Sequence, residues 1–298
     1  MGQTVDVALA HDTSVVDHNC SNPPKLPFVP LKVFDRTFSI EVESQTRING
    51  KFCVDRINVD SPQAAVSPKA LTSDKDRRIP LLPENTLYPF RRPVAIVYFQ
   101  ETDGTETNCT VFAITARAVV TNNHCISDQT QLRNARILFA YEFDMQTPIE
   151  RRALSIAVPT NERLDYTILE LDTSVPAEFV AHLSLNQVAA NQPLVLIQHP
   201  ENSRKMIVTQ GCSVKRVDSP GTAIKKSDFD HLCDSSGGSS GSPVMDLKGR
   251  VVGLHHLGRY ADDNKYYYNM AVKMNVLLSD IATTPKGREI LKDAIIDR

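Results

Sequence analysis

The chain has 298 residues, of which 41% are hydrophobic and 23% are charged, a composition typical of soluble globular proteins. The 33 Lys and Arg residues nearly balance the 35 Asp and Glu residues, and the formal net charge is −2. The sequence offers no basic stripe for a phosphate backbone, so we expect no nucleic-acid partner. No apolar run approaches the roughly 20 residues that span a bilayer, so we expect no membrane partner.

Residues 1–75 are predicted to form a loop-rich N-terminal extension. Prolines recur there, for example at 22–24 and 67–68, and residues 38–42 are the clearest short strand. The extension is either a propeptide or an accessory lobe, and the sequence does not choose between them. The N-terminus lacks the basic start and apolar core of a signal peptide, and Asp6 breaks the myristoylation pattern.

From about residue 93 the sequence changes to short β-rich runs separated by polar turns. Many short strands without helices between them indicate a barrel or a sandwich. A helical spacing of apolar residues occurs only near the C-terminus, at 274–281 and 288–296, and Pro285 interrupts it. The fold class is therefore predicted to be all-β with a C-terminal helix. The predicted strands are 94–99, 109–115, 118–122, 136–140, 166–171, 193–198, 205–210 and 251–255.

The cysteines favour disulfide bonds over a metal site. They form an even set, without the CxxC spacing or Cys/His clusters of zinc sites, so we expect no metal. Disulfides imply an oxidising compartment. Because no secretion signal is visible, either the signal has been removed from this chain or the chain is intracellular with free thiols. We expect a secreted protein, extracellular or periplasmic. The six cysteines are Cys20, Cys53, Cys109, Cys125, Cys212 and Cys233.

Three segments contain what nucleophilic catalysis needs, namely a nucleophile, a base and a group that orients the base. His124 follows the predicted strand at 118–122, and Asp165 directly precedes the predicted strand at 166–171. Ser240 lies in a glycine-rich turn whose backbone N–H groups can converge on an oxyanion. Each segment alone has an ordinary explanation, as a packed histidine, a turn former or a flexible loop. Their order, within a chain of short strands, favours catalysis.

At these segments the sequence resembles the trypsin and chymotrypsin superfamily of serine proteases, and it looks closest to the bacterial glutamyl-endopeptidase-like, or trypsin-2-like, branch. TNNHC at 121–125 is similar to the family's histidine box, and LDYTILEL at 164–171 matches its aspartate strand. GSSGSP at 238–243 resembles the branch's G-x-S-G-S-P motif. The resemblance covers roughly residues 76–282.

The resemblance implies a chymotrypsin-like double β-barrel in a protease domain at 76–298, with the active site between the barrels. It implies a serine endopeptidase in which His124 is the general base, Asp165 orients its imidazole and Ser240 is the nucleophile. The backbone N–H groups of Gly238 and Ser240 would form the oxyanion hole. It also implies protein or peptide substrates, no cofactor and a monomer.

The chain departs from the mammalian trypsins just before the nucleophile. Ser239 stands where they have the aspartate that receives the new N-terminal ammonium on activation, so that acceptor is missing. Ser239 and Ser242 are also the competing nucleophiles, and Ser240 is preferred because it follows Gly-x and precedes Gly. The step Arg77-Arg78 before Ile79 is either a processing site or a pair of solvated charges.

The resemblance also implies one disulfide, and a second is expected from the positions of the cysteines. Cys109 and Cys125 flank a predicted hairpin, as in the family's disulfide beside the catalytic histidine, and two buried free thiols are the alternative. Cys212 and Cys233 are expected to bridge the approaches to the nucleophile loop. The two cysteines of the extension would then pair with each other.

Three residues are candidates for the specificity pocket. Asp234 matches the carboxylate at the base of the trypsin pocket, which attracts Lys or Arg. His255 matches the histidine with which glutamyl endopeptidases hold a Glu side chain, and Ser235 stands at their supporting hydroxyl. Asp234 and His255 could instead pair with each other and leave little charge preference. Because a lone Asp234 repels a substrate Glu, we expect basic residues before the cut.

Two other functions fit part of the sequence. A catalytically inactive binding protein on the same fold is disfavoured by the intact His124, Asp165 and Ser240. An esterase of the α/β-hydrolase type is rejected because its triad runs Ser, Asp, His, and because its G-x-S-x-G elbow leads into a helix. Here a β-run follows the motif.

Overall fold

The structure is a computed structural model of the chain. Before residue 60 it describes the backbone of five short segments, and from residue 71 it describes most of the chain. The chain forms two compact units, 1–66 and 67–298. The predicted domain boundary at 75/76, and the role of the extension, stay predictions. The described ranges are 29–33, 36–41, 46–48, 51–53, 58–59, 71–72, 75–100, 104–143, 147–219, 224–260 and 267–297.

The first unit contains two small antiparallel sheets. Strands β1, β2 and β5 form one sheet in the order β1-β2-β5, and β3 pairs with β4 in the other. The strand predicted at 38–42 overlaps β2. The predicted pairing of Cys20 with Cys53 lies outside what the structure describes. The strands are β1 Val29–Val33, β2 Arg36–Glu41, β3 Thr46–Ile48, β4 Lys51–Cys53 and β5 Asn58–Val59.

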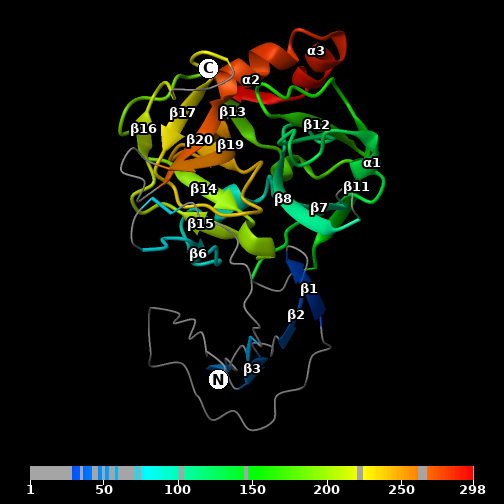
Figure 1. The fold of residues 1–298 in the computed structure, drawn as a ribbon, viewed down its shortest axis with the longest axis vertical. Coiled ribbons are helices and arrows are strands. Elements are labelled where there is room, and N and C mark those ends of the chain that lie inside the picture. The colour runs from blue at the N-terminus through cyan, green and yellow to red at the C-terminus, as the bar shows by residue number, and fades with distance from the viewer. Residues whose placement is uncertain are drawn as a thin grey trace. The chain divides into compact units, whose positions relative to one another are not determined.

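Six antiparallel strands close into a barrel in the first half of the second unit, in the order β10-β11-β12-β9-β8-β7 (Figure 1). Alternate residues of each strand point inward. On β7, for example, Ala95, Val97 and Phe99 belong to the core inside the barrel. The strands are β7 Val94–Gln100, β8 Glu106–Ala113, β9 Ala118–Thr121, β10 Arg136–Phe139, β11 Ile149–Ile156 and β12 Thr167–Leu171.

A ten-stranded sheet forms the other half of this unit. Its main path runs β16-β17-β20-β19-β18-β14-β15-β6, and β13 pairs in parallel with both β19 and β21. The strands are β6 Ile79–Pro80, β13 His182–Ser184, β14 Val195–Gln198, β15 Met206–Val208, β16 Val214–Arg216, β17 Asp228–His231, β18 Pro243–Met245, β19 Arg250–Tyr260, β20 Tyr267–Lys273 and β21 Ile295–Asp297.

The predicted all-β class with a C-terminal helix is confirmed. The predicted helix at 274–281 is α2, but the predicted segment at 288–296 is wrong in its bounds. Its helix α3 begins at Pro285, because a proline is tolerated at the first helical position, and the Thr284 side chain caps the Gly287 N–H. The chain is extended again at β21. The helices are α1 Gln129–Leu132, α2 Met274–Ile281, α3 Pro285–Leu291 and the 3₁₀ turns η1 Tyr88–Arg91, η2 Ala177–Phe179 and η3 Pro200–Asn202.

A shared hydrophobic core joins the barrel to the ten-stranded sheet. It contains Val94 and Phe112 from the barrel together with Val195 and Leu254 from the sheet. The two halves therefore form one packed unit, and segments at their junction are held on both sides. Among the described residues, no helix has the length and apolar character that a membrane crossing requires.

Candidate active site

His124 lies in the turn that follows β9. Its neighbour Cys125 is joined by a disulfide to Cys109 on β8, and the Cys125 N–H donates to the carbonyl of Asn122. The disulfide and the turn fix the backbone on both sides of the histidine, while 48% of its side chain remains exposed. The imidazole can therefore reach solvent or a bound molecule from a rigid support.

Asp165 meets His124 through two hydrogen bonds. Its Oδ2 lies 2.7 Å from Nδ1 of the imidazole, and its Oδ1 accepts the backbone N–H of His124 at 3.0 Å. Asp165 has a left-handed backbone, with φ of 49°, and its carbonyl accepts from the Asn122 side chain at 2.8 Å. Burial alone would raise its pKa, but the hydrogen bonds from His124 and His256 hold the pKa well below the ordinary value. The carboxylate is therefore ionised and oriented.

The loop that carries Ser240 is tied to the barrel through Thr110. The Thr110 N–H donates to the carbonyl of Ser240 at 2.8 Å, and its hydroxyl donates to the carbonyl of Gly238 at 2.8 Å. Gly238 and Gly241 both have positive φ, 88° and 84°. A Cβ at Gly241 would lie 2.0 Å from the Thr110 carbonyl oxygen, so only glycine fits there.

The three serines of this loop differ in exposure and in partners. Ser239 and Ser242 are fully buried, and the Ser239 hydroxyl accepts the N–H of Ser236. Ser240 is partly exposed, and within the described part of the chain its hydroxyl has no hydrogen-bond partner. Of the three, Ser240 alone presents its hydroxyl to a molecule outside the protein.

Two backbone N–H groups in the loop are also unoccupied. The N–H of Ser239 donates to the Ser236 carbonyl, and that of Gly241 donates to the His255 carbonyl. In contrast, the N–H groups of Gly238 and Ser240 have no acceptor among the described residues. The loop thus leaves free the two donors that the sequence predicted for an oxyanion hole.

A cavity of about 490 Å³ opens beside His124 and Asp165. Its lining includes His256, Asp228 and the exposed side chain of Leu257. His256 lies between two carboxylates, with Nδ1 at 3.3 Å from Asp165 Oδ2 and Nε2 at 2.8 Å from Asp228 Oδ2. The sequence analysis missed His256 and Asp228. The doublet His255-His256 is visible in the sequence, but its second histidine matched no motif.

Residues 109–254 match the family profile described as a trypsin-like peptidase domain. These residues are a trypsin-like peptidase domain of the chymotrypsin/trypsin-like superfamily. The predicted double barrel is likewise confirmed, with the closed barrel as one half and the ten-stranded sheet as the other.

Solved structures with the same fold include the Rv3671c protease from M. tuberculosis in its active form, with TM-score 0.52 and 18% identity over 74% of this chain and 91% of that chain. They also include Deg5, with TM-score 0.50 and 15% identity over 65% of this chain and 88% of that one. These likenesses show the fold.

Two curated proteins are similar in sequence over part of their length. One is the uncharacterized protein y4fB of Sinorhizobium fredii, 26% identical over 50% of this chain and 25% of its own length. The other is the secreted RxLR effector protein 73 of Plasmopara viticola, 28% identical over 47% of this chain and 38% of its own length. The match thus spans well under half of either relative.

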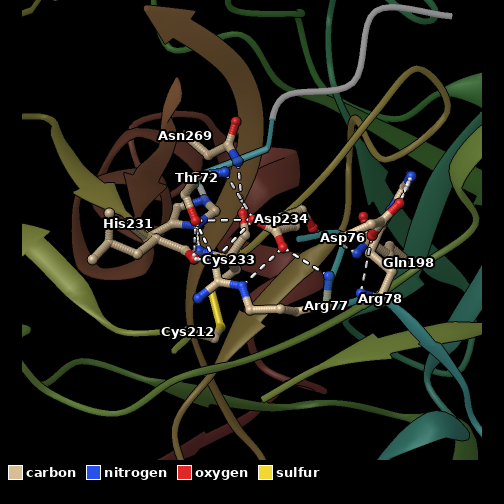
Figure 2. A network of polar contacts seen from close by, with 11 residues as sticks. Thr72, Asp76, Arg77, Arg78, Gln198, Cys212, His231, Cys233, Asp234 and Asn269 are labelled. Atoms are coloured by element: carbon tan, nitrogen blue, oxygen red, sulfur yellow. Dashed lines mark hydrogen bonds and ion pairs between the residues drawn. A yellow bond between two sulfur atoms is a disulfide. The ribbon is translucent and has the colours of Figure 1, made fainter. Parts of the chain in front are cut away.

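In the trypsin-like domain, Asp234 is a fully buried carboxylate with partners of its own (Figure 2). Arg77 approaches it as a fork, with Nε at 2.9 Å from Oδ2 and Nη2 at 2.8 Å from Oδ1. The N–H groups of Arg77 and Thr72 and the Thr72 hydroxyl donate to the same carboxylate. Burial raises its pKa, but the hydrogen bonds from Arg77 and Thr72 together outweigh burial and lower the pKa. Asp234 is thus not the lone carboxylate on which the expected preference for basic residues depended.

The other two specificity candidates, Ser235 and His255, are also buried. Nδ1 of His255 lies 3.2 Å from Nε2 of His231, whose Nδ1 accepts the Cys233 N–H. Burial lowers the pKa of both histidines, that of His231 to about 3, so both rings are neutral. The structure does not pair His255 with Asp234. The residues that contact a substrate side chain stay a prediction.

The predicted disulfide between Cys212 and Cys233 is present and braces the segment before the Ser240 loop (Figure 2). The Cys233 carbonyl accepts from the Asn269 side chain at 2.6 Å, and the Asp234 carbonyl accepts from Gln198 at 2.9 Å. The backbone that carries the Asp234 side chain is therefore held in place by a disulfide and two hydrogen bonds.

The side chains of Arg77 and Arg78 form ion pairs within the protein and are not a pair of solvated charges. Beside the Arg77–Asp234 fork, the Arg78 side chain is only 5% exposed and pairs with Asp76 and Glu201. Its guanidinium also donates to the Ser236 hydroxyl. The segment before β6 is thus tied by ion pairs to the region before Ser240.

One group of metal-type donors lies close together among the described residues, namely Cys109, His124 and Cys125. The two cysteines are joined in a disulfide and offer no thiolate, so this group does not fit a metal ion.

Proposed function

We propose that this trypsin-like protein is a serine endopeptidase with His124, Asp165 and Ser240 as its catalytic triad. The observation that carries the proposal is the pair of hydrogen bonds from His124, one backbone and one imidazole, to the ionised Asp165. Such an arrangement holds the imidazole in the tautomer whose Nε2 is a base. The tautomer follows from the carboxylate, because an ionised carboxylate only accepts.

In the proposed mechanism the Ser240 hydroxyl attacks the scissile carbonyl while His124 takes its proton. The C–O bond to Ser240 forms as the carbonyl oxygen becomes an anion, and the N–H groups of Gly238 and Ser240 bind that anion. His124 then gives the proton to the leaving amine, and the peptide C–N bond breaks to leave an acyl-enzyme. Water attacks the acyl group by the same route and releases the acid.

Protein or peptide substrates follow from the protease fold. The free hydroxyl of Ser240 and the two free N–H groups support the choice of nucleophile, because Ser239 and Ser242 are buried. The two disulfides are consistent with maturation outside the cytosol, and we propose a secreted or periplasmic location.

A fluorophosphonate probe followed by peptide mapping tests the proposal. We expect a single label on Ser240, with no label in Ser240→Ala and a retained label in Ser239→Ala. The Ser240→Ala protein should keep the wild-type melting temperature, because the change removes one oxygen. Absence of label in the wild type would identify a catalytically inactive binding protein, and a label on Ser239 or Ser242 would refute the assignment.

A further inference from the structure

Asp165 contacts a second histidine besides His124. Its Oδ2 lies 2.7 Å from Nδ1 of His124 and 3.3 Å from Nδ1 of His256. The other ring nitrogen of His256 lies 2.8 Å from Oδ2 of Asp228. The four side chains therefore form a continuous polar chain, His124, Asp165, His256 and Asp228, at the edge of the cavity beside His124.

Both ring nitrogens of His256 face carboxylate oxygens, and a carboxylate accepts but does not donate. Two such contacts at once require a proton on each nitrogen, which makes the ring an imidazolium. Burial lowers the pKa of His256, but the hydrogen bonds that His256 donates to Asp165 and Asp228, together with the charges of these carboxylates, outweigh burial and raise the pKa to about 9. The hydrogen-bond geometry and the raised pKa thus both indicate that His256 is a cation at neutral pH.

Several titratable groups surround the His256 ring. They are Asp165, Asp228, His124, His255 and His231, and Glu162 and Arg163 line the same cavity. Burial keeps His255 and His231 neutral, because it lowers the pKa of both. The groups that raise the pKa of His256 are the two carboxylates, Asp165 and Asp228.

The position and contacts of Asp228 favour an ion pair with the His256 cation. Its side chain is only 4% exposed, at the first residue of β17, and its Oδ1 accepts the hydroxyl of Ser227 at 2.5 Å. That leaves Oδ2 for His256. A buried carboxylate is costly unless it is paired, so Asp228 and His256 each require the other.

We propose that His256, held as a cation by Asp228, positions Asp165 and moderates the basicity of His124. The inference rests on the proposed function of the same site. His256 does not reach the reacting atoms, so it is a positioning residue. It contacts the same oxygen as His124 does, Asp165 Oδ2, and its charge opposes the second imidazolium that forms when His124 takes the proton from Ser240.

The test compares the pH dependence of kcat/KM and the kcat and KM values in four proteins: wild type, His256→Gln, Asp228→Asn and His182→Gln. His182 is the matched control, because it is an exposed histidine that also faces a carboxylate, with Nδ1 at 3.5 Å from Asp297 Oδ2. We expect wild-type kinetics from the control.

For His256→Gln we expect kcat to fall roughly 10- to 100-fold, the loss that corresponds to one charge-assisted hydrogen bond, with KM little changed. The rise of kcat/KM on the acidic side of its pH profile should shift to higher pH by on the order of one pH unit, because His124 has lost a positively charged neighbour. For Asp228→Asn we expect a new loss of rate with rising pH, since His256 then loses its proton more easily. Wild-type profiles in both variants would overturn the proposal.

A measurement independent of turnover separates this inference from the proposed function. In ¹⁵N-histidine NMR of the Ser240→Ala protein, His256 should keep both ring protons at pH 7, and Asp228→Asn should lower its titration midpoint. A neutral His256 at pH 7 would refute the inference even in an active protease. If wild type neither labels with fluorophosphonate nor cleaves peptides, the proposed function fails, while the NMR titration still reports on the charge of His256.

Discussion

The guanidinium of Arg77 and the carboxylate of Asp234 form a two-point ion pair, with Nε at 2.9 Å and Nη2 at 2.8 Å from the two oxygens. Asp234 is fully buried, so its charge depends on this partner. Because Asp234 lies six positions before Ser240, the pair connects the segment before β6 to the approach of the proposed nucleophile.

Arg77→Ala should destabilise the protein by about 3–5 kcal/mol, since it leaves the buried Asp234 carboxylate without its cation. Urea unfolding at pH 7 measures this. Arg92→Ala is the control, because Arg92 is exposed and should cost less than about 0.5 kcal/mol. The double variant Arg77→Met with Asp234→Leu should recover only part of the loss, because the N–H groups of Arg77 and Thr72 then lose their acceptor. Equal stability of Arg77→Ala and wild type would contradict the role of the pair.

Asp165→Asn should lower turnover about 10⁴-fold with little change in stability, because an amide at this place favours the wrong tautomer of His124. Steady-state kinetics on a peptide substrate measure the loss. Asp172→Asn, an exposed change directly after β12, should leave the rate unaltered. A loss below tenfold at Asp165 would mean that another carboxylate orients His124.

Gly241→Ala should abolish fluorophosphonate labelling and lower the melting temperature, because the new methyl group would lie 2.0 Å from the Thr110 carbonyl oxygen. Gly104→Ala is the matched control. Gly104 has nearly the same φ, 86° against 84°, but nothing lies within 4 Å of a Cβ there. It should cost only the left-handed strain, about 1 kcal/mol, and keep full labelling. Similar effects at both glycines would show that backbone strain, and not the contact with Thr110, explains the loss.

Replacing both Cys109 and Cys125 by Ser should cost about 3 kcal/mol, the chain-entropy value for a loop of this length. Denaturant unfolding of the variant against wild type gives the figure. In freshly isolated wild type, thiol counting under denaturing and non-reducing conditions should find Cys109, Cys125, Cys212 and Cys233 unreactive. Free thiols at these positions would overturn both the pairing and the proposed location.

The stability of the fold should fall between about pH 6.5 and pH 9 because of His256. Its pKa of about 9 in the folded chain lies above the ordinary value, so the contribution is complete below about 6.5 and is lost as pH rises through 9. The loss should be on the order of 3 kcal/mol. Unfolding of wild type and His256→Gln across this range isolates it, since the variant lacks this titration. Parallel curves would contradict a charged His256.

The sequence predicted the strands whose apolar runs are continuous and missed those with mixed composition. The runs at 94–99 and 118–122 became β7 and β9. Strand β11, with the sequence IERRALSI, was missed because it alternates partly buried residues with exposed ones such as Glu150 and Arg152. Strand β17 was missed because Asp228 and His231 are polar residues buried through tertiary contacts.

The candidate site was predictable where local motifs carry it and not where distant residues complete it. His124 and Asp165 stand beside recognisable strands, and the structure brings their side chains together. Arg77 and Asp234 are 157 positions apart, so no local pattern reveals that the carboxylate is already paired. His256 depends likewise on Asp228, 28 positions earlier, which only folding brings within reach.

The hydrogen bond from the Thr110 N–H to the Ser240 carbonyl connects the His124 and Ser240 segments by a short path through the protein. From His124 the chain passes to Cys125, crosses the disulfide to Cys109, reaches Thr110 and then, through one hydrogen bond, the carbonyl of Ser240. The spacing of the proposed base, His124, and the proposed nucleophile, Ser240, is therefore constrained by a few bonds as well as by the contact between the two halves. Insertions or substitutions in the surface loops would leave these bonds intact, so new substrate preferences could evolve while the two proposed catalytic residues keep their positions.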